Sequence, residues 1–172
     1  MKRLFCLAAL AAAALGPSLA AQAAGLEFAV GHTSESTMTY RLGLKSDWDK
    51  SWLQSDVGRL TGYWDGAYTY WEGDKSSASN SLSFSPVLVY EFAGGSVKPY
   101  LEAGIGVALF SHTEVEGNRL GTAFQFEDRL GFGLRFAGGH EVGIRATHYS
   151  NAGISSTNDG VESYALHYTM PL

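Results

Sequence analysis

Apolar and polar residues alternate with a period of two in eight segments of this chain. Successive side chains of a β-strand point to opposite faces, so this pattern predicts strands with one apolar and one polar face. In the clearest case, Phe124–Phe136, apolar residues take most even positions and polar residues or glycine most odd ones. The predicted strands cover residues 26–33, 38–47, 60–71, 82–92, 97–109, 124–136, 142–150 and 162–172.

The polar faces of these segments decide between two architectures. They carry charges of both signs, at Arg41, Lys45, Asp65, Glu91, Glu102, Glu127, Arg129, Arg135, Glu141 and Arg145. A soluble sandwich would place such faces in water, whereas a small membrane barrel encloses them in a polar interior where charges pair. An even number of segments of about ten residues also favours the barrel. We predict an all-β fold, an eight-stranded antiparallel transmembrane β-barrel, with a periplasmic barrel or sandwich as the alternative.

The segments between the predicted strands alternate between short and long. Ala93–Ser96 and Ala137–His140 have the composition of tight turns. The longer, polar connections cover residues 72–78, 111–121 and 151–160. Short turns on one side and longer loops on the other are typical of bacterial outer-membrane barrels.

Several details of the strands bear on this prediction. The last strand alternates without interruption to Leu172, although barrels of this class often end in an aromatic residue. Two features fit less well, because residues 49–56 exceed a tight turn and Pro86 lacks the N–H that a strand in a closed barrel donates. Glycines on the polar faces are expected to make room for larger neighbours in the lumen, at Gly43, Gly131, Gly133 and Gly143.

Residues 1–23 have the features of a secretory signal peptide. Lys2 and Arg3 precede an apolar run from Leu4 to Leu15, and Ala21-Gln-Ala23 fits a small-x-small cleavage site. Cleavage after Ala23 leaves residues 24–172 as one barrel domain and removes Cys6, the only cysteine.

The composition of the remaining chain excludes some classes of function. Loss of two basic residues with the signal peptide takes the formal net charge from −5 to −7. Without cysteine, the mature chain has no disulfide, thiol nucleophile or cysteine metal site. Its basic residues are scattered, so we expect no nucleic-acid partner.

One strand carries candidate chemistry. Val142, Ile144 and Ala146 share the apolar face of their strand, and that face continues with His148 and Ser150. In a barrel that starts on the periplasmic side, these residues fall at the extracellular, lipid-facing end of the seventh strand. Glu162 has the same parity on the eighth strand and lies opposite His148 if the hairpin turns near residue 155. A serine, an imidazole and a carboxylate in this arrangement suit acyl transfer.

A second carboxylate competes for the imidazole. The turn at Gly138-Gly139 places Asp128 opposite His148 on its other side, also on the apolar face. Either Glu162 or Asp128 could orient the histidine, and strand geometry alone does not choose between them. Phe126 lies two residues closer to the rim and would flank the site, where it could contact an acyl chain.

From Gly43 onward the chain resembles the PagL family of lipid A 3-O-deacylases. The resemblance is carried by Leu60-Thr-Gly-Tyr-Trp-Asp65, Tyr90-Glu-Phe-Ala93, Glu102-Ala-Gly-Ile-Gly-Val107, His148-Tyr-Ser-Asn-Ala-Gly153, Asn158-Asp-Gly160 and Glu162-Ser163. It implies an outer-membrane esterase that removes the 3-O-linked 3-hydroxyacyl chain of lipid A in lipopolysaccharide. It also implies Ser150 as nucleophile, His148 as base and Glu162 as orienting acid. Phe126, Asn151, Gly153 and Asn158 become candidates for substrate or oxyanion contacts.

The expected partners are lipid A and the surrounding outer-membrane lipids, with no metal or cofactor. Two other functions remain open at this point. One is a non-enzymatic small barrel used in adhesion or membrane integrity. The other is a lipid A acyltransferase with an acyl cavity inside the barrel, which the inward charges disfavour. The sequence does not determine acyl-length preference, latency or oligomeric state, and a homodimer is compatible with it.

Overall fold

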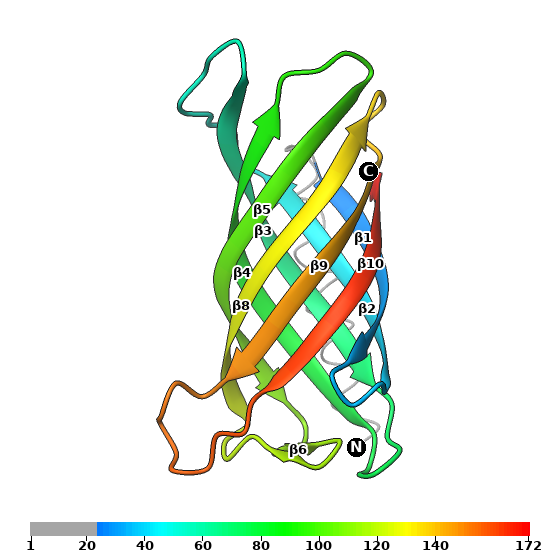
Figure 1. Ribbon diagram of the computed structural model, residues 1–172, viewed down its shortest axis with the longest axis vertical. Helices are drawn as coiled ribbons and strands as arrows, with labels where there is room; N and C mark the ends of the chain where they lie inside the picture. Colours follow the sequence, from blue (N-terminus) through cyan, green and yellow to red (C-terminus); the bar gives the residue numbers. More distant parts are fainter. Residues whose placement is uncertain (1–23) are drawn as a thin grey trace.

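The computed structural model describes residues 24–172, which form a closed barrel of eight antiparallel strands (Figure 1). The strands follow one another around the barrel in the order β1-β10-β9-β8-β5-β4-β3-β2. The predicted fold class is therefore confirmed, while the predicted signal peptide lies outside the described residues. The barrel strands are β1 (Ala24–Thr33), β2 (Met38–Asp47), β3 (Gly58–Trp71), β4 (Ser79–Phe92), β5 (Val97–Phe110), β8 (Phe124–Phe136), β9 (Glu141–Ser150) and β10 (Val161–Pro171).

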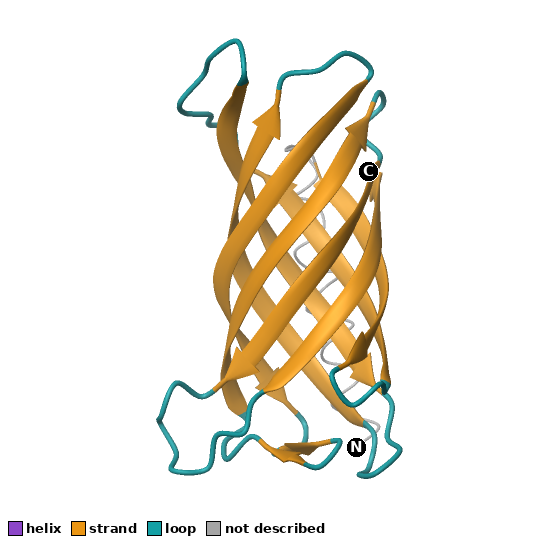
Figure 2. Ribbon diagram, in the orientation of Figure 1, coloured by secondary structure: helices purple, strands orange, loops and turns teal. Residues whose placement is uncertain are grey.

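The two ends of the barrel carry different connections (Figure 2). The terminal end, at the top of the view, is where β1 starts and β10 finishes, and there Gly25 pairs with Pro171. It carries the connections 48–57, 93–96 and 137–140. The loop end, at the bottom, carries the connections 34–37, 72–78, 111–123 and 151–160.

The loop end contains a hairpin that the alternation pattern did not predict. It consists of β6 (Glu114–Val115) and β7 (Asn118–Arg119), within the connection between β5 and β8 (Figure 1). The hairpin contributes to an apolar cluster of buried side chains at this end of the lumen. The cluster comprises Trp71, Ala108, Phe110, Val115, Leu120, Tyr149 and Val161. The hairpin is therefore part of the packed structure of the loop end.

The apolar faces of the strands point outward, as the alternation predicts. Large exposed side chains on this surface include Phe28, Val30, Leu42, Leu44, Leu82, Leu88, Leu101, Ile105, Leu130, Ile144 and Leu166. Aromatic pairs lie toward both ends, with Tyr40 near Tyr70 and Tyr90 near Phe92. A belt of this extent matches a lipid-facing surface bordered by aromatic girdles. Within the described chain, no helix is long and apolar enough to span a membrane.

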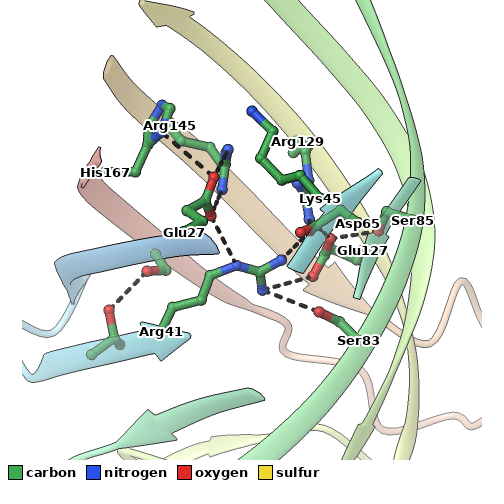
Figure 3. A network of polar contacts seen from close by, with 12 residues as sticks. Glu27, Arg41, Lys45, Asp65, Ser83, Ser85, Glu127, Arg129, Arg145 and His167 are labelled. Atoms are coloured by element: carbon green, nitrogen blue, oxygen red, sulfur yellow. Dashed lines mark hydrogen bonds and ion pairs between the residues drawn. The ribbon is translucent and has the colours of Figure 1, made fainter. Parts of the chain in front are cut away.

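The polar faces form an ion-pair network in the lumen (Figure 3). The Arg145 guanidinium donates to both carboxylate oxygens of Glu27, at 2.7 and 2.9 Å, and to Glu102 at 2.6 Å. Arg41 and Arg129 share the Asp65 carboxylate. All ten charged residues predicted to face inward are buried or nearly so. The network pairs charges that could not otherwise be enclosed in a narrow barrel.

Inward glycines admit these larger side chains. A Cβ on Gly133 would lie 2.5 Å from the Tyr100 ring, and one on Gly131 would lie 2.7 Å from a carboxylate oxygen of Glu102. These distances are shorter than van der Waals contact. Gly131 and Gly133 therefore make room for larger neighbours, as the sequence predicts, whereas a Cβ on Gly43 would lie no closer than 3.3 Å to another side chain.

Both features that fitted the barrel poorly have local explanations. The β4–β5 ladder pairs Phe84 with Val107 and Val87 with Gly104, and no pairing joins the residues between them. This interruption accommodates Pro86, which cannot donate to the ladder. The long connection 48–57 continues along β3, where the Trp48 N–H donates to the Gly62 carbonyl and residues 52 and 60 exchange two backbone hydrogen bonds.

Candidate active site

The candidate site forms where β9 ends and β10 begins, on the outward face at the loop end. His148 and Glu162 are directly opposed in the β9–β10 register. Their side chains meet, with 2.8 Å between His148 Nδ1 and Glu162 Oε1. The side chains remain 42% and 38% exposed, so the pair lies on the surface of the barrel and outside its lumen. The sequence prediction that strand parity brings these two residues together is confirmed.

The hydrogen bond sets the state of the imidazole. Nδ1–H donates to the Glu162 carboxylate, which leaves the lone pair of Nε2 free to accept a proton. Ser150 follows two residues later on the same face and is half-buried. Within residues 24–172 its hydroxyl makes no hydrogen bond. Among residues 24–172, the structure therefore joins His148 and Glu162 by a hydrogen bond but does not join Ser150 to His148.

Asp128 takes the other position beside the histidine. It lies opposite His148 in the β8–β9 register, and its side chain is exposed on the outward face. Within the described chain its carboxylate forms no hydrogen bond or ion pair. Of the two carboxylates that the sequence placed beside His148, the structure therefore brings only Glu162 into contact with it.

Asn151 organises the loop that follows Ser150. Its side chain is fully buried, and its amide donates to the carbonyls of Leu120 and Thr157, at 2.8 Å each. Its Oδ1 accepts the N–H of Gly153 at 2.9 Å. The Asn151 amide and the Gly153 N–H are thus already engaged, so they shape the loop in this structure.

Two other donors in the same loop are unengaged. The Asn158 side chain is exposed and accepts the Asn151 N–H through Oδ1, at 2.8 Å. Within residues 24–172 its Nδ2 has no acceptor, and neither has the N–H of Ala152, a residue with a φ of 52°. Both donors belong to the loop that directly follows Ser150.

Phe126 flanks the candidate nucleophile. It is directly opposite Ser150 in the β8–β9 register, and its ring contacts Phe124 edge-on at 5.2 Å. An apolar wall therefore borders Ser150 on the side away from the loop. This position suits contact with a hydrocarbon chain.

Two contacts in the site were missed in the sequence analysis. The Ser34 hydroxyl donates to Glu162 Oε2 at 3.0 Å. Gly160, with a φ of 74°, lies against His148, since a Cβ there would be 2.9 Å from the imidazole Cε1. The parity of β1 would have placed Ser34 on the outward face, but its contact depends on the closure between the first and last strands.

The described residues contain no cluster of three or more histidine, cysteine or acidic side chains that could hold a metal ion.

Comparison with known proteins identifies the family. A family model described as lipid A 3-O-deacylase (PagL) matches residues 37–171. The lipid A deacylase PagL of Pseudomonas aeruginosa is 60% identical over the full length of both chains. The chain belongs to the PagL family. A PagL protein of Bordetella bronchiseptica is 36% identical over 104 residues, which cover 60% of this chain and 58% of that protein.

Solved structures agree with this assignment. The crystal structure of the outer-membrane enzyme PagL superposes with a TM-score of 0.83 at 61% identity, and covers 86% of this chain and 99% of that one. A designed transmembrane β-barrel superposes with a TM-score of 0.53 at 13% identity, a likeness in fold alone. As a PagL-family barrel, the chain is an outer-membrane protein, and its loop end is the extracellular end.

Family membership also bears on the two other functions left open by the sequence. A PagL-family chain is an ester hydrolase. Family membership therefore argues against the alternative of a non-enzymatic barrel used in adhesion or membrane integrity. An acyltransferase would need an acyl cavity within the barrel. The cavity between Arg41, Trp71 and Arg145 measures about 20 Å³, room for about one water molecule. A larger pocket of about 230 Å³ lies at the terminal end, and its lining includes the charged residues Asp47, Arg59 and Arg135, which do not suit an acyl chain.

Proposed function

We propose that this chain hydrolyses the 3-O-linked acyl ester of lipid A, with Ser150 as nucleophile, His148 as general base and Glu162 as orienting acid. The observation that carries the proposal is the 2.8 Å distance between His148 Nδ1 and Glu162 Oε1 on the lipid-facing surface. His148 precedes Ser150 by two residues on the same face of β9. A charged hydrogen-bonded pair is costly on a surface that faces lipid, and a catalytic role accounts for it.

The reaction begins at the ester carbonyl carbon of the substrate. His148 Nε2 takes the proton of the Ser150 hydroxyl as Oγ attacks, and Glu162 stabilises the imidazolium that forms. The imidazolium then protonates the departing sugar oxygen, which leaves the acyl chain on Ser150. Water attacks this acyl-enzyme with His148 again as base, releases the 3-hydroxy fatty acid and restores the serine.

The tetrahedral intermediates carry negative charge on the former carbonyl oxygen. We assign its stabilisation to the Nδ2 amide of Asn158 and the N–H of Ala152, because neither donor is engaged within the described chain. Asn151 and Gly153 contribute by holding the loop in shape. Phe126 provides an apolar surface for the acyl chain beside the nucleophile.

The position of the site suits the substrate. Lipid A occupies the outer leaflet of the outer membrane, and the site lies on the outside of the barrel at the extracellular end. An ester of a membrane-embedded lipid can reach Ser150 from the side. This route to Ser150 does not pass through the lumen, where Arg145 pairs with Glu27 and Glu102.

Replacement of the nucleophile tests the proposal. In outer membranes that contain the native protein, mass spectra of lipid A should show loss of one 3-hydroxyacyl group. Ser150→Ala should reduce this conversion by at least about 10³-fold. Ser156→Ala, in the exposed part of the same loop, is the matched control and should convert lipid A normally. Conversion by a correctly folded Ser150→Ala protein at the native rate would exclude the mechanism.

A second pair of variants identifies the orienting acid. Glu162→Ala should lower kcat by about 10²–10⁴-fold, because the imidazole loses the group that holds its tautomer. Asp128→Ala should have a smaller effect, since Asp128 does not contact His148. A larger loss for a folded Asp128→Ala protein would reverse the assignment.

The oligomeric state is a separate question. A homodimer stays a prediction, and analytical ultracentrifugation in detergent would test it by the mass of the protein component.

A further inference from the structure

A row of four polar side chains crosses the outward face at the extracellular end. Ser34, Glu162, His148 and Asp128 lie on four neighbouring strands or their extensions, in the spatial order β1, β10, β9, β8. Ser34 is the residue after β1, and the register that pairs Thr33 with Ser163 places it opposite Glu162. The Ser34 hydroxyl donates to Glu162 Oε2 at 3.0 Å, while Oε1 of the same carboxylate contacts His148.

Ser34 is held by a tight turn. The Thr33 N–H donates to the Thr37 carbonyl at 2.8 Å, and the Ser36 N–H donates to the Thr33 carbonyl at 3.0 Å. The Thr37 hydroxyl donates to Glu116 of the β6–β7 hairpin at 2.8 Å. The turn is therefore fixed to the rest of the extracellular end, and Ser34 approaches Glu162 from a supported position.

The two oxygens of Glu162 thus have different partners. A glutamate bound through one oxygen can still rotate its carboxylate group, because the terminal torsion of this side chain is broad. A donor on the second oxygen restricts that rotation and keeps Oε1 directed at His148. Restriction matters at this site because the Glu162 side chain is 38% exposed.

We propose that Ser34 is a positioning residue of the esterase, which holds the Glu162 carboxylate in the orientation that aligns His148 with Ser150. The inference rests on the proposed function, since it acts through the same histidine. Ser34 does not contact the reacting atoms. Its effect is on kcat, through the fraction of enzyme in which the imidazole is correctly aligned.

Glu35 is the competing acceptor for the single Ser34 proton. Its carboxylate oxygens lie 3.2 and 3.3 Å from the Ser34 oxygen, compared with 3.0 Å for Glu162. The shorter distance favours Glu162. Without the Glu35 charge, the Ser34 hydroxyl should still donate to Glu162 Oε2. Glu35→Gln should therefore retain native kcat.

The first experiment compares variants of the turn on lipid A in detergent micelles. Ser34→Ala should lower kcat by about 10- to 150-fold with KM unchanged, the range expected for one hydrogen bond to a charged group. Ser34→Thr keeps the hydroxyl and should restore most of the loss. Ser36→Ala is the matched control, since the Ser36 hydroxyl makes no hydrogen bond in the described chain.

The second experiment is a double-mutant cycle with Glu162→Ala. If Ser34 acts through Glu162, adding Ser34→Ala to Glu162→Ala should change kcat by less than about 2-fold. Equal fold-losses in both backgrounds would show an effect independent of Glu162 and overturn the proposal. Native kcat for Ser34→Ala, or a loss that Ser36→Ala reproduces, would also overturn it.

Ser150→Ala distinguishes failure of the Ser34 role from failure of the proposed mechanism. Loss of activity in Ser150→Ala together with native kcat in Ser34→Ala would reject only the role of Ser34. Retained activity in Ser150→Ala would reject the proposed mechanism itself.

Discussion

At the scale of single residues, the site depends on groups that carry no chemistry of their own. Gly160 is the clearest example, because it combines a φ of 74° with direct contact to His148. A Cβ at this position would lie 2.9 Å from the imidazole Cε1 and 3.2 Å from the Tyr149 carbonyl oxygen. The absence of a side chain therefore leaves space for the His148 imidazole ring.

We expect Gly160→Ala to lower kcat by at least about 10-fold, because displacement of the imidazole weakens its alignment with Ser150. Gly117→Ala is the control, since Gly117 has a φ of 87° with open space around it and shares only the backbone strain. Steady-state kinetics on lipid A would measure both. Equal losses of kcat in the two variants would show that backbone strain alone causes the effect.

At the scale of elements, the β6–β7 hairpin connects the extracellular loops. Its Glu116 side chain accepts hydrogen bonds from the N–H groups of Asp74 and Lys75, at 2.9 and 3.2 Å, and from the Thr37 hydroxyl. Asn151 in turn donates to the carbonyl of Leu120, which follows the hairpin. The hairpin thus contacts the turn that carries Ser34 and the loop that follows Ser150.

Glu116 makes this connection sensitive to pH. Burial alone would raise the pKa of the Glu116 carboxyl, but the hydrogen bonds from Asp74, Thr37 and Lys75 outweigh it and hold the pKa below its ordinary value. A carboxyl with a lowered folded-state pKa stabilises the fold above the unfolded-state value, about 4.5. That stabilisation is lost as the pH falls through the lower, folded-state pKa.

Hydrogen–deuterium exchange would test this dependence. Protection factors of residues 114–119 should fall between pH 7 and about pH 3 in the native protein. In Glu116→Gln they should be lower at pH 7 and change less on acidification. Glu114→Gln, on the exposed side of the same hairpin, should follow the native protein. An unchanged pH dependence in Glu116→Gln would assign the titration to another group.

At the scale of the whole molecule, the barrel presents an apolar surface on its outside and encloses ion pairs on its inside. Arg145 is 5% exposed and bridges Glu27 on β1 to Glu102 on β5, across the lumen. Removal of one partner from a buried ion pair leaves an uncompensated charge. The stability of the barrel should therefore depend strongly on such residues.

We expect Arg145→Met to lower the free energy of unfolding by about 3–5 kcal/mol, because two buried carboxylates lose their partner. Arg119→Met removes a surface ion pair with Asp159 and should cost less than about 1 kcal/mol. Urea unfolding in detergent micelles, followed by gel mobility and circular dichroism, would compare them. Equal unfolding midpoints for the two variants would contradict a stabilising role for the lumen network.

Prediction from the sequence succeeded where the alternation of side chains along a strand decides the outcome. The alternation of Phe124–Phe136 set one face outward, and the same parity placed His148, Ser150 and Glu162 on that surface. Prediction failed for the β6–β7 hairpin, because two-residue strands are too short to show a period. It also missed Ser34, which meets Glu162 only because β1 closes the barrel against β10.

The sequence by itself determined the strands and their faces, and it placed the candidate residues His148, Ser150 and Glu162 on one face, because the two-residue period of a strand is a property of the backbone. Tertiary structure decided which groups form hydrogen bonds. Glu162 is the carboxylate in contact with His148, and Ser34 donates to Glu162. Asn151 and the Gly153 N–H bond to each other within the loop. These contacts depend on register, barrel closure and loop packing between residues far apart in the chain. Such long-range geometry leaves no periodic trace in the sequence.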